Sequence, residues 1–251
     1  DGLGHGAGAL VNRNPKANFG VGPLDRTHRL TINGIVELPK GFRVSMISTW
    51  NSSTPMTALV GSADVNGDGI NGDLLTTTRR GAVGRSIDSV AKLNDAIHAY
   101  NQLFAGKRNL RNQLLPFVPD VADNIKFGDS FISQDLQLSY VLKLKERVKL
   151  EATAQLFNAF NVSNLVGAAG LPSSTFNGVL ATLATLPTGF SVNSAGALVD
   201  GAGGRVIAGV SRLPNGNLIT SGFGSASAVR PSIPTGTGLP PAAQFGVRLS
   251  F

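Results

Sequence analysis

Oxygen-bearing side chains recur with a regular spacing in residues 64–73, which read Asp-Val-Asn-Gly-Asp-Gly-Ile-Asn-Gly-Asp. Acidic or amide residues at loop positions 1, 3 and 5, with Gly at position 6, are typical of calcium loops, because Ca²⁺ prefers oxygen ligands. Position 12 is Leu75 rather than a bidentate Glu. A turn whose Asp and Asn side chains bind only their own backbone is the competing interpretation. The candidate ligands for Ca²⁺ are Asp64, Asn66, Asp68 and Asp73.

Residues suited to catalysis are few and scattered. The chain has no Cys and three His, so disulfides and thiolate metal sites are excluded. His98 falls off the apolar stripe of the helix expected around it and is interpreted as a solvated surface residue. The sequence contains no nucleophile and base spaced as hydrolysis needs. We therefore expect no enzymatic activity, no catalytic residue and no cofactor other than Ca²⁺.

The charge balance is basic, with a net charge of +7 and a pI near 10.1. Lys and Arg are scattered along the chain, with modest clusters only at Arg79-Arg80 and in residues 107–111. Nucleic acid is therefore not an expected partner. No run of about eighteen apolar residues occurs, which excludes a spanning α-helix and leaves a β-barrel as the way across a membrane.

Two-residue alternation is cleanest in residues 133–161. Apolar side chains occupy every second position from Leu136 to Leu144, and again from Val148 to Leu156 after the turn Lys145-Glu146-Arg147. This pattern predicts a β-hairpin. Each arm has about ten residues, the length of a tilted strand that crosses a bilayer. A soluble sheet also alternates, but the large aliphatic face, the mixed polar face and the short charged turn favour a membrane barrel.

Two other segments repeat this design. A second hairpin turns at Pro39-Lys40-Gly41, and Trp50 near the end of its return strand suits either a membrane-interface girdle or a packed core. The last strand alternates and ends in an aromatic residue. In this it resembles the terminal signal by which bacterial outer-membrane barrels are recognised for insertion, here Phe245, Val247, Leu249 and Phe251.

Two long excursions separate the strands. Residues 51–131 contain a helix pattern over 86–106, with apolar residues three and four positions apart, Ser86 or Asp88 as a cap and Gly106 at the end. Such a helix must bury its apolar stripe, so this excursion is expected to fold as a cap. Residues 162–241 are rich in Gly, Ala, Ser and Thr, and Pro214-Asn215-Gly216 predicts a small β-ribbon there between residues 205–212 and 218–222.

Several motifs in a fixed order resemble the C-terminal end of a TonB-dependent outer-membrane receptor, of the Oar-like type with a carboxypeptidase-regulatory-like N-terminal domain. They are Asp25-Arg26-Thr27-His28-Arg29, Glu37-Leu38-Pro39, the strand with Trp50, residues 64–69, Phe157-Asn158-Ala159-Phe160-Asn161 and residues 245–251. The resemblance implies periplasmic turns at Lys40, Lys145 and Glu146. It also implies extracellular excursions and a location in the outer membrane of a Gram-negative bacterium.

The expected fold is therefore all-β: residues 1–251 form the C-terminal portion of a single antiparallel transmembrane β-barrel, with about five strong strands and long extracellular loops. Its lumen would be lined by Arg29, Arg43, Asp135, Lys143, Glu151 and Arg248. Five strands cannot close a pore, and an open edge is not tolerated in lipid. Expected partners are outer-membrane lipid, the barrel assembly machinery, and either the N-terminal strands and plug of a longer chain, with Asp1 an internal start, or further copies of this chain.

Three functions are compatible with this pattern. The first is a receptor or transporter that takes up a ligand through a plugged lumen. The second is a surface-structural protein whose loops assemble into a lattice, tube or fibre, because charge-poor loops of Gly, Ala, Thr and Ser suit packing against copies of themselves. The third is a soluble β-sandwich that binds or hydrolyses a ligand.

Overall fold

The computed structural model describes residues 16, 19–22, 24–61, 63–144, 148–162, 164–166, 178–209, 223–224, 228–229 and 241–251. The chain divides into two compact units that alternate along the sequence. Residues 1–25, 55–128 and 176–225 form one, here called the loop unit. Residues 26–54, 129–175 and 226–251 form the other, here called the sheet unit.

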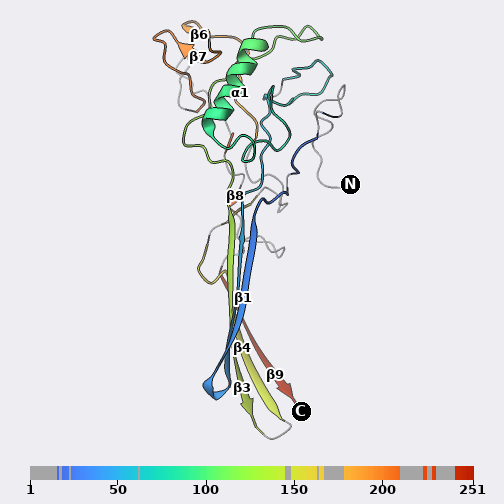
Figure 1. Cartoon of the computed structure of the whole chain (residues 1–251), viewed down its shortest axis with the longest axis vertical. Coiled ribbons are helices and arrows are strands. Elements are labelled where there is room, and N and C mark those ends of the chain that lie inside the picture. The colour runs from blue at the N-terminus through green and yellow to red at the C-terminus, as the bar shows by residue number, and fades with distance from the viewer. Residues whose placement is uncertain are drawn as a thin grey trace. The chain divides into compact units, whose positions relative to one another are not determined.

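The sheet unit contains five antiparallel strands in the order β1-β2-β3-β4-β9 (Figure 1). These are β1 (Arg29–Leu38), β2 (Phe42–Asn51), β3 (Phe131–Lys143), β4 (Lys149–Phe157) and β9 (Ala242–Ser250). A two-residue pairing of β5 (Leu165–Val166) with β8 (Ala228–Val229) accompanies them. The strands alternate because their sequences do, which confirms the expected all-β fold.

The turn between β1 and β2 is a short helical turn, η2 (Pro39–Gly41), in which Lys40 and Gly41 have φ angles of 65° and 83°. Glycine is needed at the second position, because a Cβ there would lie 2.5 Å from the carbonyl oxygen of Val141. Lys40 thus lies at a tight turn, as expected. The turn expected at Lys145 and Glu146 lies outside the described residues.

The register gives the sheet two consistent faces. One rung runs through Val36, Val44, Leu138, Ala154 and Phe245, each paired with the next across the sheet. Since side chains alternate along a strand, the even-numbered residues of β1 to β4 and the odd-numbered residues of β9 share one side, the apolar face. The remaining strand residues form the polar face.

The loop unit is built around the helix α1 (Val90–Leu103) and the ribbon of β6 (Phe190–Val192) and β7 (Leu198–Asp200). Leu93, Ile97 and Tyr100 of α1 are fully buried, so its apolar stripe is covered as expected. No helix among the described residues is both long enough and apolar enough to span a membrane.

The two excursions fold together into this single unit. Isolated backbone bridges join Leu59 to Val179, Phe117 to Leu183 and Asp120 to Ile207. Every fully apolar side chain that is buried among the described residues belongs to the loop unit. The loop unit therefore has a hydrophobic core, whereas the large apolar side chains of the sheet strands are partly or fully exposed.

One expected element differs in the structure, and another lies largely outside the described residues. The helix spans 90–103 rather than 86–106, because Ser89 is its N-cap, accepting a hydrogen bond from the Lys92 N–H, while Ile87 bonds back to Ala82 in a turn. The ribbon expected around Pro214 falls largely outside the described residues. The described ribbon is β6–β7, whose turn is organised by Asn193, which accepts hydrogen bonds from the N–H groups of Ala195 and Ala197.

Candidate functional site

The apolar face of the sheet is the largest exposed apolar surface of the sheet unit. Phe245 and Val247 of β9 are 79% and 76% exposed, and Val36 of β1 is 59% exposed. Soluble proteins rarely leave a contiguous apolar surface of this extent in water. Three of the expected insertion-signal residues, Phe245, Val247 and Leu249, share this face, and Phe251 follows just beyond β9.

Both edges of the sheet are built for pairing. β1 and β9 are ten and nine residues long, contain no Pro, and run in register without a bulge. Soluble proteins interrupt such edges with Pro, bulges or charges, because unpaired backbone groups recruit other strands. Neither edge has a Pro or a bulge, and the charged residues of the two edge strands, Arg29, Glu37 and Arg248, all lie on the polar face.

Aromatic side chains mark two levels of the apolar face. Trp50, half exposed, donates its indole N–H to the Ser48 hydroxyl at 2.8 Å. At the η2 end, the rings of Phe42 and Tyr140 lie 4.7 Å apart. Trp50 and Phe42 are eight residues apart on β2, or about 27 Å along the strand. With a tilt of about 40° this gives a depth of about 20 Å, close to the apolar band of outer-membrane barrels.

The polar face contains all six side chains expected to line a lumen. Arg43 forms an ion pair with Glu37 at 3.1 Å, and Glu151 lies opposite Arg248 in the register. Exposed pairs of this kind contribute at most about 1 kcal/mol. Lys143 lies opposite Lys149, which concentrates positive charge at the turn end. Arg29 is at the other end of β1. That this face lines a lumen stays a prediction.

Asp135, the sixth of these residues, has a structural contact that the sequence did not reveal. Its Oδ1 accepts hydrogen bonds from the Asn158 N–H at 2.9 Å and from the Ser133 hydroxyl. Asn158 and Asn161 have positive φ angles of 46° and 51°, a conformation that Asn tolerates well. The Phe-Asn-Ala-Phe-Asn motif is therefore a turn at the end of β4, held by a carboxylate of β3.

The four candidate calcium ligands lie together in one loop, but their oxygens bind the loop itself. Asp64 accepts hydrogen bonds from the N–H groups of Asp68 and Gly69, and Asp73 accepts two from Asn66. Burial and the neighbouring Asp68 and Asp64 raise the pKa of Asp73, although the backbone hydrogen bonds oppose this shift. No group of three or more acidic, His or Cys side chains with metal-binding geometry occurs in the described part of the chain. The calcium site stays a prediction, and the self-bonded turn accounts for the contacts.

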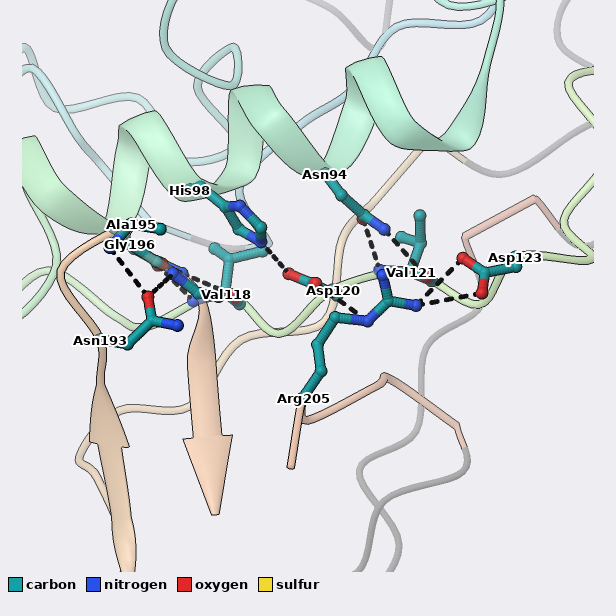
Figure 2. A network of polar contacts seen from close by, with 12 residues as sticks. Asn94, His98, Val118, Asp120, Val121, Asp123, Asn193, Ala195, Gly196 and Arg205 are labelled. Carbon is teal, nitrogen blue, oxygen red and sulfur yellow. Dashed lines mark hydrogen bonds and ion pairs between the residues drawn. The ribbon is translucent and has the colours of Figure 1, made fainter. Parts of the chain in front are cut away.

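A buried carboxylate forms the centre of the largest polar cluster in the loop unit (Figure 2). Asp120, fully buried, lies 2.8 Å from Nε2 of His98 and 3.3 Å from Nε of Arg205, and Arg205 also binds the exposed Asp123 at 3.0 Å. Burial raises the pKa of Asp120, an effect that the charges of His98 and Arg205 partly offset. His98 is thus a partner of a buried acid, and its interpretation as a solvated surface residue is wrong.

Two buried asparagines attach α1 to the segment that carries Asp120 (Figure 2). Asn94 exchanges hydrogen bonds with the backbone of Val121, and Asn101 does the same with Val118. Asn101 also donates to the carbonyl of Gly196 in the β6–β7 turn. The cluster therefore holds α1, the segment 116–123 and the second excursion together.

A strongly two-sided antiparallel sheet, exposed and apolar on one side and polar on the other, with edges free of Pro and bulges, is typical of a membrane β-barrel wall. Residues 1–193 match the family model described as outer membrane beta barrel domain, and the chain belongs to this family. The protein is therefore an outer-membrane β-barrel protein. No curated protein and no solved structure matches the chain.

Proposed function

We propose that this chain supplies the C-terminal strands and the extracellular loops of a TonB-dependent receptor in the outer membrane of a Gram-negative bacterium. The observation that best supports this proposal is the sheet, which has five strands, an exposed apolar face, a polar face and two open edges. The order of the sequence motifs supports the receptor type. In such a receptor the loops capture a ligand that then passes through a plugged lumen.

The five strands need more strands to complete the barrel. Barrels whose interior is filled by side chains have about eight strands, and larger receptors more. Within lipid, an unpaired edge leaves backbone groups unsatisfied, at a cost of several kcal/mol for each. We propose that strands N-terminal to these residues pair with the edges of β1 and β9, and that a plug, also N-terminal, fills the lumen. We also propose that the assembly machinery recognises β9.

The loop unit supplies the recognition surface in this proposal. A loop of seventy or more residues is usually functional or disordered. Here the two excursions share a hydrophobic core that contains Leu93, Val118 and Leu198, which favours a functional role. A fixed core holds the surface residues in place, which reduces the entropy lost when a ligand binds. The role is non-enzymatic.

The intact mass of the native polypeptide, extracted from outer membranes and measured under denaturing conditions, tests this proposal. A mass several times 26.0 kDa is expected, because a plug and the remaining strands must belong to the same chain. Deleting residues 55–128 from the full chain should then abolish ligand uptake while the barrel still inserts. A mass near 26.0 kDa would refute the receptor proposal.

The second candidate is a surface-structural protein in which several short chains share a barrel and their loop units pack against one another. The observation in its favour is the same self-contained core, because a rigid head suits repeated contacts between copies. A mass near 26.0 kDa, together with regular arrays in electron micrographs of the membranes, would support it. Isolated particles without repeating contacts would count against it.

A further inference from the structure

We propose that the hairpin formed by residues 107–114, here called the cationic hairpin, binds the phosphate-bearing headgroup of a glycolipid in the outer leaflet of the membrane. This proposal rests on the proposed function in one respect, since it takes the excursions to be extracellular. It names a partner for the loop unit other than the transported ligand. The argument depends on the rigidity, the charge and the exposed leucines of the hairpin.

The hairpin has a fixed shape because Asn109 organises its tip. Its Oδ1 accepts hydrogen bonds from the N–H groups of Arg111 and Gln113, and its Nδ2 donates to the carbonyl of Asp64 at 2.6 Å. The base is closed by the Leu115 N–H, which donates to the carbonyl of Lys107. A surface that is ordered beforehand loses little entropy when it binds a partner.

Three cations lie within five residues of this hairpin, and each retains hydrogen-bond donors. Lys107 donates to the carbonyls of Gln102 and Leu103 at the end of α1, and Arg108 donates one N–H to Asn112. Among the described residues, neither has a carboxylate partner within ion-pair distance. Arg111 lies 4.0 Å from Asp64 and its side chain is 56% exposed. A guanidinium has five donors, whose fork matches phosphate oxygens.

Apolar side chains accompany these cations. Leu110 at the tip is 76% exposed, and Leu103 and Leu114 are 52% and 44% exposed. Single exposed leucines are common, but Leu110 and Leu114 alternate with the cations of one short hairpin, and Leu103 is the last residue of α1, whose carbonyl accepts a hydrogen bond from Lys107. Surfaces that combine Lys or Arg with Leu are suited to the boundary between charged headgroups and acyl chains. A free phosphate or a soluble polyanion would leave the leucines in water, so a phosphorylated lipid fits better.

A thiol introduced at Leu114 provides the test, because residues 1–251 contain no cysteine. The full native protein carrying Leu114→Cys, with any cysteine outside these residues replaced by Ser, is labelled with an environment-sensitive fluorophore, kept in detergent and titrated with diphosphorylated lipid A. We expect a blue shift that saturates. The shift should be absent with the same glycolipid after removal of its phosphates. Inorganic phosphate should neither produce the shift nor compete at equal concentration.

The double variant Arg108→Gln, Arg111→Gln should bind lipid A on the order of thirtyfold more weakly, since each cation near an anionic lipid surface contributes about fivefold. Arg79→Gln, Lys126→Gln removes the same charge elsewhere in the loop unit and should bind as the parent does. Unchanged thermal unfolding of both variants is the folding control.

Equal weakening in both variants, an equal response to dephosphorylated glycolipid, or no response to lipid A would each overturn the proposal. Competition by inorganic phosphate would also overturn it, since the hairpin would then bind free phosphate rather than the lipid headgroup. Because the titration is done in detergent, it reports on the hairpin whatever the mass of the native chain. Failure of the receptor proposal and failure of this one therefore give different results.

Discussion

A lysine placed on either side of one strand measures the sidedness of the sheet directly. Leu136 and Gln137 are neighbours on β3, and the register places them on the apolar and the polar face respectively. Leu136 is four residues from Ile132, which pairs with Trp50. It is also four residues from Tyr140, at the other aromatic level. Each distance is about 13 Å along the strand, or about 10 Å in depth at a tilt of about 40°. If the two aromatic levels mark the interfaces, Leu136 therefore lies near the centre of the hydrocarbon layer.

The expected cost follows from this depth. A lysine on the lipid side near the midplane costs roughly 2–4 kcal/mol, whereas a lumen-facing lysine is solvated. Leu136→Lys should therefore lower the free energy of unfolding of the protein by about that amount. Gln137→Lys, which adds the same charge one residue away, should change it by less than about 0.5 kcal/mol.

Urea unfolding of the full protein in phospholipid vesicles, followed by its tryptophan emission, measures both values. Heat-modifiable migration on gels verifies that each variant has folded into a barrel. Equal costs for the two variants, or a larger cost for Gln137→Lys, would refute the assignment of the apolar face to lipid. A soluble sheet with both faces in water would give that equal result.

The other predictions concern four single positions. Trp50 should emit at short wavelength in bilayers and be quenched by lipids brominated near the headgroup, whereas quenching only by aqueous iodide would contradict its place at the interface. Because burial raises the pKa of Asp120, the folded loop unit binds a proton at this carboxylate more readily than the unfolded chain does. Wild type should therefore gain stability over Asp120→Asn as the pH falls through the raised pKa, with the gain complete below 3.8, in thermal unfolding across a pH series. Gly196→Ala should destabilise the loop unit by at least about 1 kcal/mol, since φ is +88° and a Cβ would lie 2.2 Å from a helix carbonyl; faster hydrogen exchange in α1 would report it. Calcium should leave the unfolding midpoint unchanged for wild type and for Asp73→Asn, and a rise confined to wild type would establish the metal site.

The strands were predictable from the sequence because alternation is a local signal. Leu136, Leu138 and Tyr140 were assigned to one side from spacing alone, and the register puts them there. The loop unit was not predictable in this way. The contact between Asp120 and Arg205 joins residues far apart in the chain, and neither belongs to a periodic pattern. His98 lies off the apolar stripe of α1, and its partner is the buried carboxylate of Asp120. Hydrophobic periodicity carries no information about such polar partners.

The polar contacts that shape the turns were only partly predictable. Asn158 and Asn193 belong to a residue type that favours turns, but the sequence does not tell which backbone groups an Asn will bind. A signal for Asn94 and Asn101 was present: they lie seven positions apart, two helical turns, on the buried side of α1. Polar residues on that side indicate a hydrogen-bonded attachment to backbone rather than simple packing.

The division of the loop unit between two excursions limits how this protein can change over time. Its core and its bridges, such as Leu59 with Val179 and Phe117 with Leu183, need sequence from both sides of the β3–β4 hairpin. A recombination event that replaced one excursion alone would leave half of that core facing unrelated side chains. If the loop unit recognises a ligand as proposed, new specificities arise by substitutions on its surface, or by inheritance of residues 55–225 as a single block that includes the β3–β4 hairpin.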